Sequence, residues 1–357
     1  MNISIATFHW SQNYGALLQT YALKKHLEDL GHSVSIIDCK PDSKHKKESI
    51  SSRIKDIILL SSHPLDHFRI KKQCACLQQF RLEHFSLIDE KEIRDIDAIV
   101  CGSDQIWNSK LTGGALFPLY FGLSQYYSFP KRIAYAASLG EKEIPEKDKT
   151  RFQEYLKGMD YVSVREESLV NLVENYTDKK IANVIDPTLL LDTSDYIRLI
   201  DGGCIKTNQK YVLIYQNTYD ARLSRIADAI AQSIGGIVVE IARKRYRPFS
   251  NHRIILNGGV ETFLSMYQNA SYVITNTFHG TVFALQFKKQ FFSIPLKGRE
   301  SRVLNLLHQL GLENRIISIE RPDCLNEPDI DYSIVESSLS KMRKQSDEFL
   351  SIALGGD

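Results

Sequence analysis

Short apolar runs alternate with segments of helical periodicity along most of this chain. The first apolar run covers residues 3–8, a helical pattern follows over 17–27, and a second apolar run covers 34–38. A strand–helix–strand order within about 35 residues is typical of a parallel α/β unit. The opening pattern therefore predicts a parallel sheet with covering helices.

The same alternation continues through the chain. In the first half we expect strands at 96–100, 131–140 and 161–164 and helices at 146–158 and 168–174. After a break in composition at 192–209, a second series predicts strands at 211–216, 237–241, 272–275 and 291–294 and helices at 220–234, 261–268 and 279–287. Because 357 residues exceed a usual single core, we expect an α/β protein of two domains.

The domain boundaries are expected at the break in composition. An N-terminal Rossmann-like domain is predicted over 1–195, with an inserted helical segment at about 40–85, and a C-terminal Rossmann-like domain over 205–330. Residues 331–357 are expected to form a helix that packs back on the N-terminal domain. The insertion is net basic, so it is either a solvated helical arm or a region of peripheral membrane contact.

Composition and charge narrow the class of protein. Hydrophobic residues make up 43% of the chain and charged residues 25%, as in ordinary globular proteins. A net charge of +2 is too small to indicate a nucleic-acid partner. The six cysteines lack the paired spacing of a zinc site, which predicts reduced thiols and a cytoplasmic protein. No apolar run reaches the length of a bilayer span, so any membrane contact is expected at the inner face.

The most informative polar segment follows the predicted strand 272–275. It places His279 at the start of a helix, with Thr277, Gly280 and Thr281 around it. A helix start offers unpaired N–H groups and the positive end of the dipole, which together favour an anion. His279 would add a titratable group to such a site. The alternative is a histidine that caps the helix and is satisfied by a neighbouring carbonyl.

A comparable turn lies near the N-terminus. Gly15 would let the backbone approach an anion, and Asn13 and Gln19 could bond sugar or phosphate oxygens. The alternative is a turn glycine with Asn13 as a helix N-cap. The segment is not a G-x-G-x-x-G motif, so a dinucleotide site is weakly supported.

Two further strand ends carry polar side chains. Ser103, Asp104 and Gln105 follow the strand at 96–100 and predict either ligand contacts or a helix cap. Arg165 ends the strand at 161–164 and could clamp a carboxylate or phosphate. The alternative for Arg165 is an internal ion pair with Glu166 or Asp186.

The densest basic run covers residues 243–247. It is typical of a solvated face, but it could also grip a diphosphate or anionic lipid headgroups. The chain contains no H-E-x-x-H, G-x-S-x-G or P-loop motif, so no bound metal is expected.

Six segments, taken in order, resemble the polysaccharide pyruvyl transferase family. They are residues 7–19, 102–108, 135–140, 163–166, 186–190 and 277–283, and the resemblance extends over about residues 1–315. It implies a GT-B-like architecture, with two Rossmann-type domains facing each other across a cleft. It also implies phosphoenolpyruvate as donor, a sugar diol as acceptor and a pyruvate ketal as product, without a cofactor, in bacterial exopolysaccharide or capsule synthesis. The acceptor could be lipid-linked or nucleotide-linked.

The resemblance also assigns roles to single residues. The donor-binding turn of characterised relatives reads arginine–leucine–histidine; His279 matches the histidine, and Thr277 stands in place of the arginine. Another cation must then supply the charge, or the donor differs; the candidates are Arg165, Lys297, Arg299 and Arg302. We expect donor contacts from Thr277, Gly280 and Thr281 as well.

The remaining roles concern catalysis and the acceptor. His279 would bind the phosphate or act as general acid, and Arg165 would clamp the donor. Asp104 or Glu261 would be the base for the sugar hydroxyl. Acceptor contacts are expected from His9, Asn13, Gly15, Gln19, Ser103, Gln105 and Trp107.

Two other functions compete with pyruvyl transfer. A GT-B glycosyltransferase that uses a nucleotide sugar would share the fold and would use the run at 243–247 to hold a diphosphate. A non-catalytic relative would keep the cleft and lack the chemistry, which the missing arginine at position 277 would explain. Stabilisation by phosphoenolpyruvate or by a nucleotide diphosphate separates the first two functions.

Overall fold

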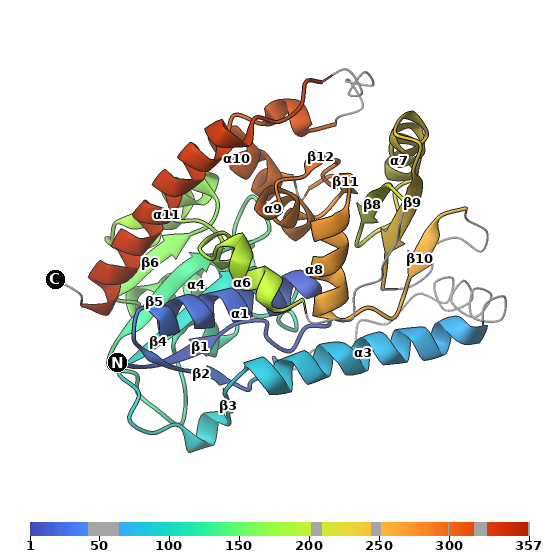
Figure 1. Cartoon of the computed structure of the whole chain (residues 1–357). Helices are drawn as coiled ribbons and strands as arrows, with labels where there is room; N and C mark the ends of the chain where they lie inside the picture. Colours follow the sequence, from blue (N-terminus) through green and yellow to red (C-terminus); the bar gives the residue numbers. More distant parts are fainter. Residues whose placement is uncertain (42–63, 201–208, 244–250, 299, 318–326, 356–357) are drawn as a thin grey trace. The chain divides into compact units, whose positions relative to one another are not determined.

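The computed structural model describes residues 1–41, 64–200, 209–243, 251–298, 300–317 and 327–355 (Figure 1). The chain divides into two compact units, which are described separately. Unit 1 comprises Met1–His45, Arg81–Leu191 and Ser333–Asp357, and unit 2 comprises Lys46–Phe80 and Asp192–Tyr332. Among the described residues, no helix has the length and apolar character that crossing a bilayer requires.

Unit 1 is built on a seven-stranded sheet in the order β3-β2-β1-β4-β5-β6-β7. The strands are β1 (Asn2–Ala6), β2 (Ser33–Ile37), β3 (Leu87–Ile88), β4 (Ala98–Asp104), β5 (Arg132–Ala137), β6 (Tyr161–Val164) and β7 (Ile181–Asn183), and every pairing is parallel. The strand order reverses at β1. Strands β2 and β3 lie on one side of β1, and β4 to β7 lie on the other, so the branch point is between β1 and β4. This is the Rossmann strand order.

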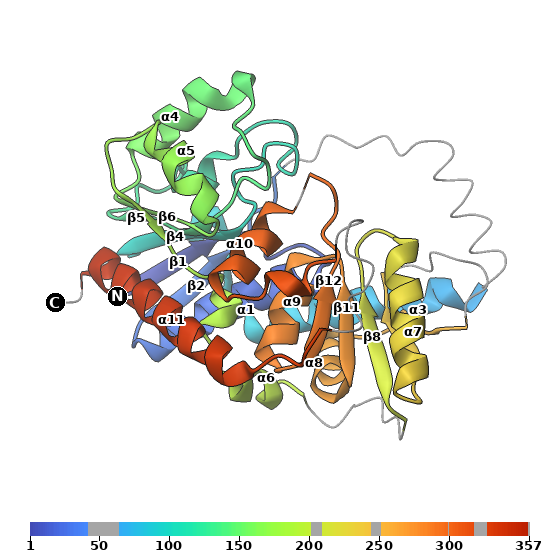
Figure 2. The same ribbon diagram turned by 90° about the horizontal axis from the view of Figure 1, so that it is seen from above.

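Helices cover both faces of this sheet. They are α1 (Tyr14–Asp29), α4 (Lys149–Lys157), α5 (Val170–Glu174) and α11 (Tyr332–Leu354). Figure 2 shows α4 and α5 on one face and α1 and α11 on the other. His26 Nε2 on α1 lies 2.9 Å from Asp347 Oδ1 on α11. The C-terminal helix therefore belongs to the layer of α1.

Unit 2 repeats the same plan on a five-stranded sheet in the order β10-β9-β8-β11-β12. Its strands are β8 (Tyr211–Tyr215), β9 (Ile237–Ile241), β10 (Arg253–Ile255), β11 (Tyr272–Thr275) and β12 (Gln290–Ser293), again all parallel. The branch point lies between β8 and β11. The residues of β8 and β9 are mostly apolar and buried, as expected for strands covered on both faces.

The helices of unit 2 also lie on both faces of its sheet. They are α3 (Pro64–His84, as far as Phe80), α6 (Thr193–Arg198), α7 (Ala221–Ser233), α8 (Val260–Asn269), α9 (Phe278–Gln286) and α10 (Ser301–Gln309). In Figure 2, α7 lies on one side of β8 and β11, whereas α8 and α9 lie on the other. Right-handed crossovers that leave the central strands in opposite directions produce this arrangement.

Short 3-10 helices connect these elements. They cover Glu90–Glu92, Pro118–Phe121, Glu146–Asp148, Glu167–Leu169, Pro187–Leu189 and Glu313–Arg315. The expected α/β class with two Rossmann-type parallel sheets is confirmed. The expected cleft between two facing domains stays a prediction.

The organisation of the chain differs from the expectation in two places. Helix α6 occupies part of the segment 192–209 that was expected to be a linker, and the chain passes from unit 1 to unit 2 at Leu191 and Asp192. The described part of the expected insertion is one long helix, α3, and its residues up to Phe80 group with unit 2 rather than with the N-terminal domain. Residues 42–63 of that insertion lie outside the described part of the chain.

Candidate functional site

Both sheets have a branch point, where ligands of α/β proteins usually bind at the carboxyl ends of the strands. In unit 1 it lies between β1 and β4, which lead into the turn at residues 7–15 and into Asp104. In unit 2 it lies between β8 and β11, which leads into the turn before His279. The segments singled out in the sequence therefore sit at the two edges where a site is expected.

The edge of unit 1 is built around Arg165. Its Nη1 donates a hydrogen bond of 2.6 Å to Asp186 Oδ2, and its Nε lies 3.4 Å from Glu166 Oε1. Asp104 is the third carboxylate, with Oδ1 at 3.6 Å from Nη2. Burial alone would lower the pKa of Arg165, but the charges of Glu166, Asp186 and Asp104 outweigh it and the pKa is raised. Arg165 is therefore a buried, fully charged group.

Hydroxyl groups form hydrogen bonds with two of these carboxylates. Thr188 Oγ1 donates to Asp186 Oδ1 at 2.6 Å, and Ser138 Oγ donates to Glu166 Oε1 at 2.8 Å. Ser103 Oγ lies 3.1 Å from Asp186 Oδ2. A guanidinium that already faces three carboxylates attracts a further anion weakly. The geometry thus favours the internal ion pair, the alternative stated for Arg165, over the clamp on the donor.

Asp104 differs from the other two carboxylates in its access to solvent. Its side chain is 15% exposed, compared with 3% for Glu166 and 0% for Asp186. Its backbone is held at φ 71°, in the left-handed region that non-glycine residues seldom adopt. Ala136, at the end of the neighbouring strand, has φ 49°. Such strained residues cost about 1–3 kcal/mol each and gather at functional sites.

The first turn of unit 1 is tied to the same edge. Thr7 Oγ1 donates to Ser103 O at 3.0 Å, and Gln19 Nε2 donates to Thr7 Oγ1 at 3.0 Å. His9 is fully buried, with Nδ1 at 3.0 Å from Thr7 O and Nε2 at 2.9 Å from Asp38 Oδ1. Burial lowers the pKa of His9, against the raising effect of these two contacts. His9, Gln19 and Ser103 therefore position one another.

Other expected acceptor contacts have structural roles. Asn13 Oδ1 accepts the Gly15 N–H at 2.8 Å, which is the N-cap of α1 and the alternative stated above. Trp107 is only 1% exposed and stacks on Phe121 with ring centroids 5.7 Å apart. The ring is part of the hydrophobic core, which does not favour the expected acceptor contact from Trp107. Gln105 Oε1 accepts a hydrogen bond of 3.1 Å from Asn108 Nδ2 in the same turn.

The edge of unit 2 has a different chemistry. Thr277 is the N-cap of α9, and its Oγ1 accepts the Gly280 N–H at 2.9 Å. Thr275 Oγ1 donates to Tyr215 O at 2.7 Å. A Cβ at position 280 would lie 2.0 Å from Thr275 Oγ1, so only glycine fits. His279 is then the second residue of a nine-residue helix, next to the positive end of its dipole.

Thr281 does not face the helix start. Its Oγ1 lies 2.6 Å from Ser293 Oγ on β12 and 3.2 Å from Thr277 O. The hydroxyl is therefore used in packing α9 against the sheet. The expected donor contact from Thr281 has no support in this geometry.

Arg302 lies beside Phe278, the residue before His279. Its guanidinium carbon lies 5.9 Å from the ring centroid of Phe278, within cation–π range, and that ring is 5.2 Å from the His279 ring. Lys297 is exposed on the segment after β12. Arg299, also expected to bind the donor, lies outside the described residues.

The other candidates contribute less. The Glu261 carboxylate folds back toward Gly259 at the start of its own helix, where a Cβ at position 259 would lie 2.5 Å from Oε2. The carboxylate therefore lies at the start of α8, and its role as a base stays a prediction. Of the basic run 243–247, only Arg243 is described, and it is exposed. None of the four described cysteines forms a disulfide, and no cluster of described side chains could hold a metal ion.

With the geometry established, the relation to known proteins is clear. Residues 13–298 match the family model of polysaccharide pyruvyl transferases. The chain belongs to the polysaccharide pyruvyl transferase family. No curated protein matches it.

Three of the solved structures that are similar to this chain are those of two epimerases and a glycosyltransferase. UDP-GlcNAc 2-epimerase from Neisseria meningitidis, bound to UDP-GlcNAc, is 9% identical over 99% of this chain and 94% of its own, with a TM-score of 0.49. The UDP-GlcNAc 2-epimerase from Methanocaldococcus jannaschii is 14% identical over the whole of both chains, also at 0.49. The glycosyltransferase SnogD from Streptomyces nogalater is 13% identical over 98% and 95%, at 0.43. The family assignment rests on the sequence match alone.

The structure also holds a polar cluster that the sequence did not reveal. Gln216 Nε2 donates to Glu240 Oε1 at 2.8 Å, and Glu240 Oε2 lies 3.8 Å from His252 Nδ1. His252 Nε2 lies 3.0 Å from Asp228 Oδ1. Burial lowers the pKa of His252, but Glu240 and Asp228 outweigh it and the pKa is raised. The position of Glu240 at the end of a predicted strand was the only available signal.

Proposed function

We propose that this member of the family transfers the pyruvyl group of phosphoenolpyruvate to a sugar diol. The products are a pyruvate ketal on the sugar and inorganic phosphate, in the synthesis of a bacterial surface polysaccharide. The observation that carries the proposal is the family match over residues 13–298. We place the reaction in the cytoplasm, at the inner membrane face if the acceptor is lipid-linked.

The edge of unit 2 is the proposed donor site. Phosphoenolpyruvate carries two to three negative charges, so its site needs positive groups. The start of α9 supplies a dipole, His279 supplies a proton donor, and Arg302 supplies a permanent charge beside Phe278. Arg302 would then replace the arginine that relatives carry at position 277.

The edge of unit 1 is the proposed acceptor site. Asp104 is the most exposed carboxylate of the Arg165 network, so a sugar hydroxyl can reach it. We assign Asp104 as the base and Arg165 as the group that fixes its position. Gln19 Oε1 is buried without a hydrogen-bond partner among the described residues.

The proposed reaction balances without a cofactor. A proton, delivered from His279, adds to the methylene carbon of phosphoenolpyruvate and leaves positive charge on C2. One sugar hydroxyl attacks C2 and gives its proton to Asp104. The C2–O bond to phosphate then breaks, and the second hydroxyl attacks C2 and closes the ketal ring. One of the two hydroxyl protons restores His279, whose own proton is now in the methyl group, and the other leaves with the phosphate.

The test is release of inorganic phosphate from phosphoenolpyruvate by the purified full chain. A panel of lipid-linked and nucleotide-linked sugars serves as acceptor, and mass spectrometry of the acceptor detects the ketal. Release that requires a sugar with two suitably placed hydroxyls supports the proposal. No release with any acceptor of the panel, although phosphoenolpyruvate binds, would indicate a non-catalytic relative.

A thermal-shift comparison separates the proposal from nucleotide-sugar transfer. A ligand at 100 times its Kd stabilises the native state by about 2.7 kcal/mol. Phosphoenolpyruvate is expected to raise the unfolding temperature, and UDP is not. Stabilisation by UDP alone would favour a glycosyltransferase instead.

A further inference from the structure

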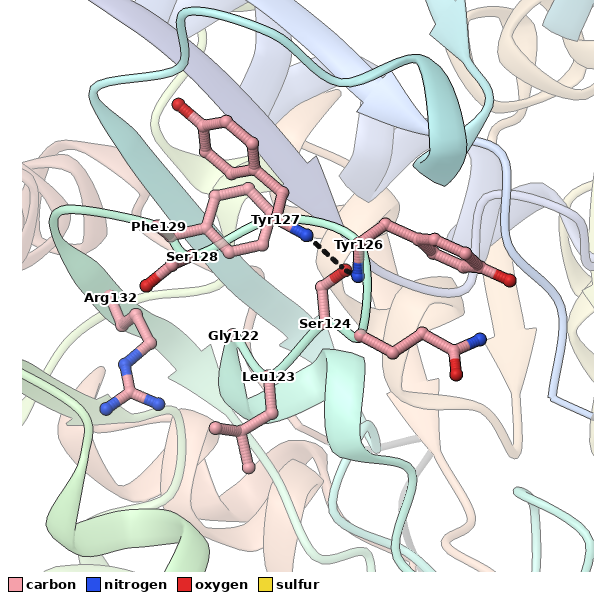
Figure 3. A pocket seen from close by; sticks show the side chains of 9 residues that line it. Gly122, Leu123, Ser124, Tyr126, Tyr127, Ser128, Phe129 and Arg132 are labelled. Atoms are coloured by element: carbon pink, nitrogen blue, oxygen red, sulfur yellow. Dashed lines mark hydrogen bonds between the residues drawn. The ribbon is translucent and has the colours of Figure 1, made fainter.

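A pocket with a volume of about 420 Å³ opens in unit 1, away from the candidate site. It is lined by the loop from Gly122 to Phe129 and by Arg132 (Figure 3). Arg132 is the first residue of β5, whereas the candidate site begins where β5 ends, at Ala137. The pocket therefore lies at the opposite edge of the sheet. Its volume is within the range of small-molecule sites.

The wall of this pocket is held in place by its own hydrogen bonds. Tyr127 OH donates to Ile96 O and accepts the Ile96 N–H, both at 3.0 Å. Ser124 Oγ accepts the N–H groups of Tyr126 and Tyr127, at 3.0 and 3.2 Å, and the second of these bonds is drawn in Figure 3. The Tyr127 and Phe129 rings are in contact, with centroids 5.1 Å apart. The loop is thus preformed.

Arg132 is the charged group of the pocket, and two glycines make room for it. A Cβ at Gly158 would lie 2.0 Å from Arg132 Nη2, and a Cβ at Gly122 would lie 2.8 Å from Cγ and Cδ. Asp160 accepts only the backbone N–H of Arg132, at 2.7 Å. Within the described part of the chain, the guanidinium has no hydrogen-bond or ion-pair partner. It contrasts with Arg165, which has three carboxylates around it.

The other side chains of the pocket are those that recognise sugars. Tyr126 is 46% exposed, and the Lys91 ammonium lies 5.8 Å from its ring. Ser124, Gln125 and Ser128 add hydroxyl and amide groups. An aromatic face with a few polar groups suits a carbohydrate, and a guanidinium suits a planar or tetrahedral anion. We propose that this pocket binds a sugar carrying a carboxylate or a phosphate, at a site separate from the candidate active site.

The competing explanation is purely structural. Gly158 is the C-cap of α4, so the Arg132 guanidinium also lies near the negative end of that helix. In that case Arg132 would affect stability and bind nothing. The binding experiment distinguishes the two, because a helix-capping arginine gives no affinity for an added sugar.

The experiment is isothermal titration calorimetry of the full chain with four probes. Glucuronic acid carries a carboxylate, glucose 6-phosphate carries a phosphate, and glucose and inorganic phosphate each lack one half of the proposed ligand. At least one charged sugar is expected to bind at least tenfold more tightly than both glucose and phosphate, and the better one identifies the anion. Absence of binding by both charged sugars would overturn the proposal, as would equal binding of glucose or of phosphate.

Variants locate the binding in this pocket. R132Q is expected to lower the affinity at least tenfold. G158A keeps the charge but displaces the guanidinium, and the same loss is expected; it also serves if R132Q folds poorly. K131Q, which removes the neighbouring charge, is the matched control and should bind as the wild type does. Wild-type affinity in both R132Q and G158A would overturn the proposal.

One further variant separates this site from the proposed catalytic function. H279A alters the edge of unit 2 and should leave the affinity for the charged sugar unchanged. Loss of that affinity in H279A would assign the binding to the active site and overturn the separate pocket. If the wild type shows no pyruvyl transfer, binding of the charged sugar in this pocket is still expected.

Discussion

The two sheets share one strand order, yet the edges at their branch points carry opposite kinds of chemistry. In unit 1, Arg165 is enclosed by Asp104, Glu166 and Asp186. In unit 2, the turn before α9 carries hydroxyl side chains. Thr277 is the N-cap of the helix, and His279 lies at the helix start. The first edge is charge-dense, with three carboxylates around one cation, whereas the second presents the positive end of a helix.

This difference decides which edge suits which substrate. An anionic donor gains little from a cation that three carboxylates already surround, but it gains from a helix dipole and a nearby Arg302. A neutral sugar needs hydrogen-bond acceptors and a base, which carboxylates supply. Under the proposed function, the two sheets provide one site each, and the side chains at the strand ends suit one site to the donor and the other to the acceptor.

The largest expected effect is on stability, at the edge of unit 1. R165M would leave three carboxylates without their buried cation, and removal of one partner of a buried pair costs about 3–5 kcal/mol. Urea unfolding measures this loss. R222M is the matched control in unit 2, because its pair with Asp220 is partly exposed and should cost at most about 1 kcal/mol. Equal losses in both variants would contradict the idea of a locked network.

The next effect is on activity, at the edge of unit 2. H279A is expected to lower turnover by about a hundredfold or more, because a positioned proton donor contributes that much. Steady-state phosphate release measures it. H308A removes an exposed histidine of α10 and should leave turnover unchanged. If H279A turns over nearly as fast as the wild type, His279 has no part in catalysis.

Much of this fold is predictable from the sequence, and the limits are physical. The strands at 237–241 and 272–275 are predicted to the residue, because buried parallel strands are rich in apolar and β-branched residues. β3, β7 and β10 have two or three residues each and carry too short a pattern. α6 was missed because polar residues 192–195 look like a linker, although they form a capping box.

The candidate site is predictable in position but not in pairing. Strand ends identify Arg165, Asp104 and His279, since the sheet order brings such ends to one edge. Only three-dimensional packing shows that Asp104 joins Asp186 around Arg165, or that Trp107 is buried against Phe121. The pocket at residues 122–132 was missed for the same reason, because its sequence reads as an ordinary polar loop.

A smaller effect is expected at the cap of α9. T277A removes the acceptor for the Gly280 N–H, and loss of an N-cap costs about 1 kcal/mol. Thermal or urea unfolding measures this loss. T277S retains the hydroxyl and is the control, expected to be close to the wild type. If T277A is as stable as T277S, the N-cap hydrogen bond of Thr277 does not contribute to stability.

The smallest effect, and the sharpest contrast between the units, is the pH dependence of two buried histidines. The pKa of His252 in unit 2 is raised above 6.5, because Glu240 and Asp228 outweigh burial, whereas burial lowers the pKa of His9 in unit 1.

A raised pKa stabilises the native state fully below about 6.5, and this contribution is lost as the pH rises through the native pKa. A lowered pKa does the reverse, and its contribution is lost as the pH falls below about 6.5. The stability gap between wild type and H252Q should therefore shrink from pH 6 to pH 9, and the gap between wild type and H9Q should shrink from pH 7 to pH 5. Urea midpoints at these pH values measure both gaps, and slopes of the same sign would contradict the opposite pKa shifts of the two histidines.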